Sequence, residues 1–202
     1  VVLRGGLPAR QGMIEAGYKG LMVPYRWQTG AGFAVDHMSD PSYKRTMARG
    51  LAKKVVEHRR NYPDDPVYLA GLSAGCAVVL YALEELPPDV AVDQVILLSS
   101  SVSADFDLSK AIRHVRGKIY VFTSDRDAVL KELAATFGTA DGKRVGTDIS
   151  GLRGFHMTYG GKVENIPWRP EFAAYGHHGG HTDAVATPFV KQFVAPLVKP
   201  AQ

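Results

Sequence analysis

The stretch Gly71-Leu72-Ser73-Ala74-Gly75 constrains the fold of this chain more than any other. It follows the apolar, β-forming run Val67–Ala70 and precedes small, apolar residues at 76–86, which favour a helix ending before Pro87-Pro88. A serine with a glycine two residues away on either side suits a sharp strand-to-helix turn, because the strained backbone lifts the hydroxyl and larger flanking side chains would collide. Chance can produce this pattern in a glycine-rich chain, but the flanking strand and helix favour a nucleophile elbow at Ser73.

Apolar runs alternate with amphipathic stretches along the rest of the chain. Strands are expected at 1–3, 21–25, 67–70, 95–98, 118–123 and 163–167, and helices at 11–18, 42–60, 76–86, 107–115, 131–135 and 187–194. Loops are expected at 33–42 and 137–161. Alternating strands and helices are typical of an α/β protein with a mostly parallel central sheet and helices on both faces. Without a repeat or linker, residues 1–202 are predicted to form a single domain.

Composition narrows the classes of function. The net charge is +4, and the basic residues are scattered rather than interleaved with aromatic residues in a stripe, so nucleic-acid binding is not expected. The single cysteine, Cys76, excludes an internal disulfide. No apolar run approaches membrane-spanning length and no signal peptide is visible. Because the chain begins at Val1, whether an upstream segment was removed stays open, as does localisation; a soluble cytoplasmic protein is favoured.

Candidate acidic and basic partners for the serine follow later strands. A serine hydroxyl needs a base within hydrogen-bond reach, and the base needs a partner that orients it. Asp125 and Asp127 come after the strand predicted at 118–123, and the cluster 177–181 follows the last strand. Because the carboxyl ends of parallel strands meet at one edge of a sheet, these groups are expected to face the same crevice as Ser73.

The chain resembles the α/β-hydrolase superfamily. The resemblance covers nearly the whole length and rests on the elbow, the acid loop 124–129, a Gly-His pair before the C-terminal helix, and the order serine, aspartate, histidine. It implies Ser73 as nucleophile, His181 as general base and then general acid, and Asp127 as the carboxylate that orients the histidine.

The resemblance also implies an oxyanion hole built from backbone N–H groups. One donor is the N–H of Ala74, and the turn Gly5-Gly6-Leu7 points to the N–H of Leu7 as the other. Two departures from the family pattern stand out. Gly5 replaces the usual histidine, and the segment 25–32 lacks the aspartate and serine that the family often has around its glycines.

Alternatives remain for the acid and the base. Asp125 lies nearer the strand end and is the alternate acid, with Asp105 and Asp107 as outside candidates. His177 and His178 are the alternates to His181, expected otherwise to line the crevice or to sit exposed. The remaining histidines have no companion motif and are expected to be surface or satisfied interior residues: His37, His58, His114 and His156.

The favoured function is a serine hydrolase that cleaves a small-molecule acyl ester or thioester without a cofactor. Its cleft is expected to be lidless, with Tyr25, Trp27 and Phe106 as walls and with 137–161 either as a flap or as a surface loop. The cluster His177, His178 and His181 also permits a metal-dependent hydrolase, although Gly179-Gly180 disfavours the helix on which such ligands usually converge. A non-catalytic binding protein with the same fold is the third possibility.

Overall fold

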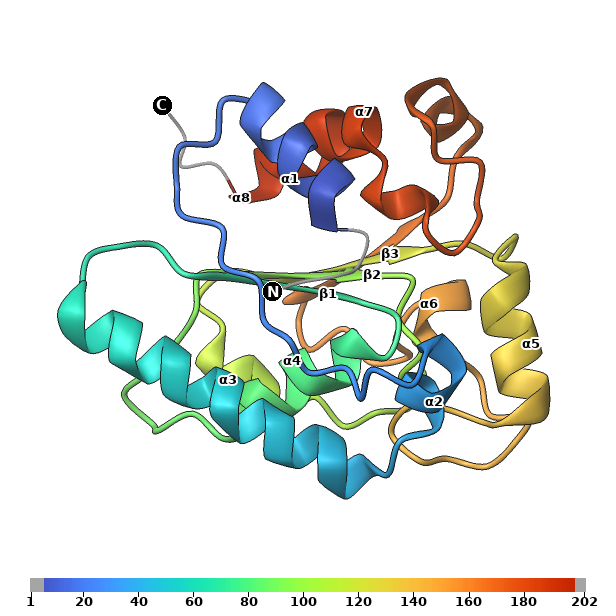
Figure 1. Ribbon diagram of the computed structural model, residues 1–202, viewed down its shortest axis with the longest axis horizontal. Helices are drawn as coiled ribbons and strands as arrows, with labels where there is room; N and C mark the ends of the chain where they lie inside the picture. The colour runs from blue at the N-terminus through green and yellow to red at the C-terminus, as the bar shows by residue number, and fades with distance from the viewer. Residues whose placement is uncertain (1–5, 199–202) are drawn as a thin grey trace.

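The computed structural model describes residues 6–198 and contains a four-stranded parallel sheet in the order β1-β2-β3-β4 (Figure 1). The strands are β1 Tyr68–Leu72, β2 Gln94–Leu98, β3 Ile119–Thr123 and β4 Val163–Pro167. The prediction of an α/β protein with a parallel sheet is confirmed at this level. The strand predicted at 1–3 lies outside the described residues.

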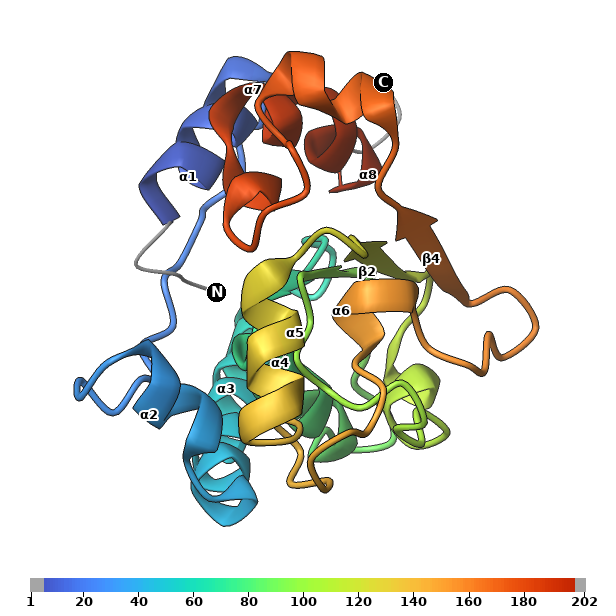
Figure 2. The same ribbon diagram turned by 90° about the vertical axis from the view of Figure 1, so that its right-hand side faces the viewer.

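Helices cover both faces of the sheet (Figures 1 and 2). One face carries α3 Pro41–Asn61, α4 Gly75–Glu84, η1 Ala111–His114, α5 Ala128–Thr136 and α6 Ser150–Arg153. The other face carries α1 Gly6–Glu15, α7 Thr187–Phe189, η4 Val190–Val194 and α8 Ala195–Val198. Two short 3₁₀ helices, η2 Pro170–Tyr175 and η3 Asp183–Val185, follow β4. When parallel strands are added in one direction, right-handed crossovers place all the connecting helices on the same face of the sheet. This explains why the helices between β1 and β4 share one face.

Each face of the sheet has its own apolar core, because side chains alternate along a strand. The core against α3 and α4 includes Leu69, Val95, Leu97, Ile119 and Val121. The core against α1 and the C-terminal helices includes Leu72, Ile96, Leu98, Phe122 and Phe189. Two buried faces require strands that are apolar throughout, as the run at 95–98 is.

The structure differs from the sequence-based expectation between α1 and α3. Helix α1 begins at Gly6, earlier than the expected residue 11. Residues 21–25 are not among the four described strands, and Leu21 is 84% exposed. The hydroxyl of Tyr25 donates to the carbonyl oxygen of Met47 at 2.5 Å, so a side chain ties this segment to α3. The expected loop at 33–42 contains the helix α2 Phe33–Met38.

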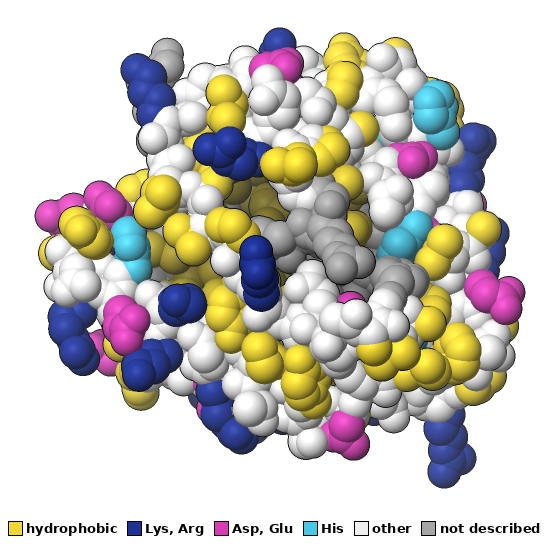
Figure 3. Space-filling model, in the orientation of Figure 1, with side chains coloured by type: hydrophobic (Ala, Val, Ile, Leu, Met, Phe, Trp, Pro, Cys, Tyr) yellow, Lys and Arg dark blue, Asp and Glu magenta, His cyan; other side chains and the backbone are white. Residues whose placement is uncertain are grey.

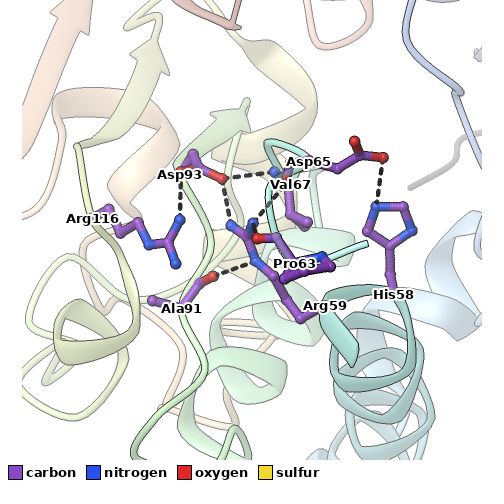
Figure 4. Close-up of polar contacts among 8 residues, drawn as sticks. All are labelled: His58, Arg59, Pro63, Asp65, Val67, Ala91, Asp93 and Arg116. Carbon is purple, nitrogen blue, oxygen red and sulfur yellow. Dashed lines mark hydrogen bonds and ion pairs between the residues drawn. The ribbon is translucent and has the colours of Figure 1, made fainter. Parts of the chain in front are cut away.

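A cluster of charged groups joins α3 to the amino ends of β1 and β2 (Figure 4). The Arg59 guanidinium lies 2.5 Å from a carboxylate oxygen of Asp93 and donates to the carbonyl oxygen of Ala91 at 3.0 Å. The same Asp93 oxygen accepts from the N–H of Val67 at 2.7 Å, and Arg116 lies 3.3 Å from the other oxygen. This cluster lies at the opposite end of the sheet from Ser73. It fixes the amino ends of β1, which leads to Ser73, and of the neighbouring strand β2.

The surface carries dispersed charge. On the face shown in Figure 3, lysine and arginine side chains are separated by apolar and uncharged surface. In the part of the chain that the structure describes, no helix is both long enough and apolar enough to cross a membrane.

Candidate functional site

Ser73 lies at a strained turn between β1 and α4. Its φ angle is 53°, in a region that residues other than glycine rarely adopt. A Cβ atom at Gly71 would lie 2.9 Å from the backbone nitrogen of Cys76, and one at Gly75 would lie 3.2 Å from the indole nitrogen of Trp27. Gly71 is therefore needed for the close packing of this turn, and a side chain at Gly75 would have to displace Trp27 slightly. This close packing agrees with the expected geometry of a nucleophile elbow.

The backbone of Ser73 is fixed against the end of the neighbouring strand. Its N–H donates to the carbonyl oxygen of Leu98 at 3.0 Å, and its own carbonyl oxygen accepts from Ser101 at 3.4 Å and from Cys76 at 3.0 Å. The side chain is 4% exposed, and its hydroxyl has no hydrogen-bond partner within the described residues. The turn thus presents a buried hydroxyl on a rigid backbone.

Asp127 is buried and uses both carboxylate oxygens. As the N-cap of α5 it accepts from the N–H of Leu130 at 2.9 Å, and its other oxygen lies 2.8 Å from Nδ1 of His181. A carboxylate only accepts hydrogen bonds, so Nδ1 of His181 carries the proton and Nε2 has the lone pair that can take another. Asp125, the alternate acid, is exposed.

The loop that carries His181 is attached to the loop that carries Asp127. The hydroxyl of Ser124 donates to the carbonyl oxygen of Gly179 at 2.8 Å, and the Trp168 indole donates to that of His177 at 2.7 Å. Gly179 has a φ of 102°, and a Cβ atom there would lie 2.7 Å from Cβ of Arg126. Glycine is required at this contact, which sets the position of the histidine two residues later.

The other two histidines of the cluster do not converge with His181. The His177 ring stacks on Phe172 with centroids 5.9 Å apart, and burial lowers its pKa to about 4. His178 is exposed. Among residues 6–198, no group of three or more His, Cys, Asp or Glu side chains is arranged to hold a metal ion. The arrangement needed for the metal-dependent alternative is thus not formed, and His177 packs in the core instead of lining a crevice.

The sheet order sets the spacing of the three candidate residues. Ser73 follows β1 and Asp127 follows β3, with β2 between them. Neighbouring strands are about 4.8 Å apart, so the two strand ends are separated by about 10 Å. An imidazole with a hydrogen bond at each nitrogen spans on the order of 8 Å. These general spacings are compatible with an imidazole between the two loops, and no hydrogen bond joins His181 to the Ser73 hydroxyl.

The two predicted oxyanion donors lie at helix starts. Ala74 is the N-cap residue of α4, where backbone N–H groups are not used by the helix itself. Leu7 lies in the first turn of α1 and is 80% exposed. Gly5 lies outside the described residues. The role of the Leu7 N–H stays a prediction.

Of the three predicted wall residues, Trp27 lies against the elbow, at Gly75. Tyr25 is hydrogen-bonded to α3, and Phe106 packs against Tyr81 with ring centroids 5.9 Å apart.

Cys76 is fully buried, and burial raises its pKa to about 12, so it is held as the thiol rather than the nucleophilic thiolate.

Two buried polar side chains, those of His37 and Ser101, were missed from the sequence. His37 is 2% exposed and Ser101 is fully buried, and neither Nδ1 of His37 nor Oγ of Ser101 has a hydrogen-bond partner among the described residues. His37 is therefore not the surface or satisfied interior histidine that was expected. No sequence motif surrounds His37. For Ser101, the one signal in the sequence was its position after the apolar strand that lies beside the elbow strand.

The segment 137–161 is tied to the residues that follow β2. Ala140 donates to the carbonyl oxygen of Ser101 at 2.9 Å, Ser103 donates through its hydroxyl to Asp141 at 2.6 Å, and the Ser150 hydroxyl donates to that of Ser100 at 2.8 Å. These bonds anchor the segment to residues 100–103, which follow β2.

No family model, curated protein or solved structure that was compared matches this chain.

Proposed function

We propose that the protein is a serine hydrolase that cleaves acyl esters or thioesters through Ser73, His181 and Asp127. The observation that supports this most is the buried 2.8 Å contact between His181 Nδ1 and Asp127. It lies at the same sheet edge as the strained serine, and a base oriented by a carboxylate is what a serine nucleophile requires.

The proposed reaction has two halves. The Ser73 oxygen attacks the substrate carbonyl while its proton moves to Nε2 of His181, and the Ala74 N–H donates to the resulting oxyanion. The C–O or C–S bond to the leaving group then breaks, and His181 returns the proton to that group. In the second half His181 takes a proton from water, the hydroxide attacks the acyl-serine, and the carboxylic acid leaves as the proton returns to Ser73.

Asp127 has two parts in this proposal. Its contact with His181 keeps the proton on Nδ1, and its negative charge stabilises the imidazolium that forms during both halves of the reaction. Its second oxygen caps α5, so the carboxylate cannot rotate away without breaking a bond to the backbone.

Matched substitutions of the two loop aspartates test the proposal. Asp127→Asn preserves the size of the side chain and removes its charge, so kcat for p-nitrophenyl acetate hydrolysis should fall by about 10³-fold to 10⁴-fold. Asp125→Asn, at an exposed site in the same loop, is the control and should leave kcat within about twofold. Equal effects of the two substitutions, or a larger effect at Asp125, would contradict the assignment.

A further inference from the structure

Trp27 lies with the nitrogen edge of its indole ring against the amino end of α4. The segment that leads into α2 carries it past the start of α4 (Figure 1). A Cβ atom on Gly75 would lie 3.2 Å from Nε1 of Trp27, and the next nearest atoms, Cε2 and Cζ2, belong to the same edge of the ring. Trp27 is 7% exposed, and Gly75 is the second residue after Ser73. The indole nitrogen therefore faces the turn that carries the proposed nucleophile.

The backbone of Trp27 is held in place, whereas its indole N–H has no acceptor among the described residues. The backbone N–H donates to the side-chain oxygen of Gln28 at 3.3 Å, and the carbonyl oxygen accepts from the Tyr43 hydroxyl at 2.8 Å. Neither bond uses the ring, although a buried indole N–H usually has a partner. The nitrogen is also not one of the sealed polar atoms of the described chain, so part of it meets solvent. It is free to donate to a ligand.

The start of α4 offers further donors at the same place. The first hydrogen bond within the turn runs from the Cys76 N–H to the carbonyl oxygen of Ser73 at 3.0 Å. The N–H groups of Ala74 and Gly75 precede it, and no described residue accepts from them. They lie at the positive end of the helix dipole, which favours an acceptor that carries negative charge.

The indole N–H of Trp27 and the backbone N–H of Gly75 are close enough to share one acceptor. A Cβ atom lies about 2.5 Å from the nitrogen of its own residue, so the 3.2 Å contact places the two nitrogens at most about 6 Å apart. Two donors that each lie about 2.9 Å from one oxygen are separated by up to about 6 Å. A single oxygen atom beside the start of α4 can therefore accept from both.

We propose that the indole N–H of Trp27, together with the N–H groups at the start of α4, donates to the substrate oxygen that becomes the oxyanion. This inference rests on the proposed function, since the oxygen belongs to the ester bound at Ser73. The oxygen gains negative charge as Ser73 attacks, so a donor that is already oriented stabilises the transition state more than the bound substrate. Trp27 is then a catalytic residue and not only a wall of the cleft.

The indole proton of Trp27 can be observed directly by NMR, because the chain has two tryptophans. In protein labelled with ¹⁵N-tryptophan, either Trp27→Phe or Trp168→Phe assigns the two indole signals. A fluorophosphonate then places a phosphoryl oxygen where the oxyanion forms. The Ser73 oxygen bonds to phosphorus, the P–F bond breaks, fluoride leaves, and the serine proton passes to His181.

In this adduct the Trp27 indole proton should move downfield and exchange more slowly with solvent, because it gains an acceptor. The Trp168 indole proton is the internal control and should hardly move, since it already donates to the carbonyl oxygen of His177 at 2.7 Å. The adduct on Ser73 is counted in the same sample by mass.

Kinetics of Trp27→Phe give a second readout. Phenylalanine keeps an aromatic ring in the core but has no N–H, so kcat for p-nitrophenyl acetate hydrolysis should fall by about 10²-fold while KM stays within about threefold. Rates are divided by the number of sites that the fluorophosphonate finally labels, so misfolded protein does not contribute. A loss through KM alone, or an unchanged kcat, would overturn the inference.

The outcomes separate this inference from the proposed function. If Ser73 forms the adduct and the Trp27 signal does not move, Trp27 is not a donor and the proposed function stands. Equal movement of both indole signals reports a general change of structure and also overturns the inference. If mass shows no adduct on Ser73, the proposed function fails, and the role of Trp27 fails with it.

Discussion

At the scale of single residues, three side chains could be identified from the sequence because each has a local signature. Ser73 is flanked by glycines, Asp127 follows a strand, and His181 follows a glycine before the last helix. The structure pairs His181 with Asp127 and leaves Asp125 exposed. His37 has no local signature, since its position depends on contacts with residues that are distant in sequence, such as Gly138.

His177 makes folding stability depend on pH. Its folded-state pKa of about 4 lies below the ordinary value of 6.5, so the unfolded chain binds the proton more tightly. The stability that its neutral form supplies is complete above about pH 6.5 and is lost as the pH falls toward 4. We expect His177→Asn to remove about 1–3 kcal/mol of this pH-dependent loss.

Urea unfolding of wild type and His177→Asn at pH values of about 7 and about 4.5 measures this difference. Asparagine can still accept from the Gly179 N–H, as Nδ1 of His177 does, but it does not titrate. The exposed neighbour His178 supplies the control substitution, His178→Asn. The same loss of stability on acidification in wild type and His177→Asn would show that His177 is not the group responsible.

At the scale of elements, the sequence predicted the strands and helices that have strong apolar patterns and missed those fixed by tertiary contacts. Helix α3 was visible because its apolar residues recur on one face. Helix α2 is short, and the Lys44 ammonium stabilises its C-terminal end by donating to the carbonyl oxygen of His37. The apolar run at 21–25 looks like a strand from its composition alone, which does not reveal whether a partner strand lies beside it.

The contact between the histidine loop and the acid loop depends on Gly179. In Gly179→Ala the new Cβ must move Arg126, so the loop and His181 shift, and kcat/KM should fall by more than about tenfold. Gly146→Ala is the matched control because Gly146 also has a positive φ, of 85°, but nothing lies within 4 Å of its Cβ position.

Steady-state hydrolysis and thermal unfolding of both variants separate the two effects. Both alanines add backbone strain of about 1 kcal/mol, and the overlap with Arg126 should make Gly179→Ala the less stable of the two. Only Gly179→Ala should lose activity. Equal activity in the two variants would mean that this contact does not position the histidine.

The joint between α3 and the strands depends on Arg59. Its side chain is 8% exposed and bonds Asp93, so Arg59→Met should lower the free energy of unfolding by about 2–3 kcal/mol. Arg60→Met, on the exposed side of the same helix, should change it by less than about 0.5 kcal/mol. Urea unfolding monitored by circular dichroism compares them, and a loss at Arg60 as large as that at Arg59 would contradict the structural role of the cluster.

At the scale of the whole molecule, the sheet explains why residues far apart in the sequence meet. Parallel strands in sequential order bring the ends of β1, β2 and β3 to one edge, where Ser73, Ser101 and Asp127 follow them. The α/β class and this edge could be predicted from alternating strands and helices. The covering of the second face by α1 together with the C-terminal helices could not, because it depends on packing between the two ends of the chain.

The most direct test of the central claim is the mass of the protein after reaction with a fluorophosphonate, with the modified residue located by peptide mapping. A serine activated by His181 and Asp127 should form one covalent adduct, on Ser73, in the folded protein and none after denaturation. Ser73→Ala should remove both the adduct and the hydrolysis of p-nitrophenyl acetate. An unmodified Ser73 in folded protein, together with unchanged hydrolysis in Ser73→Ala, would contradict the serine mechanism.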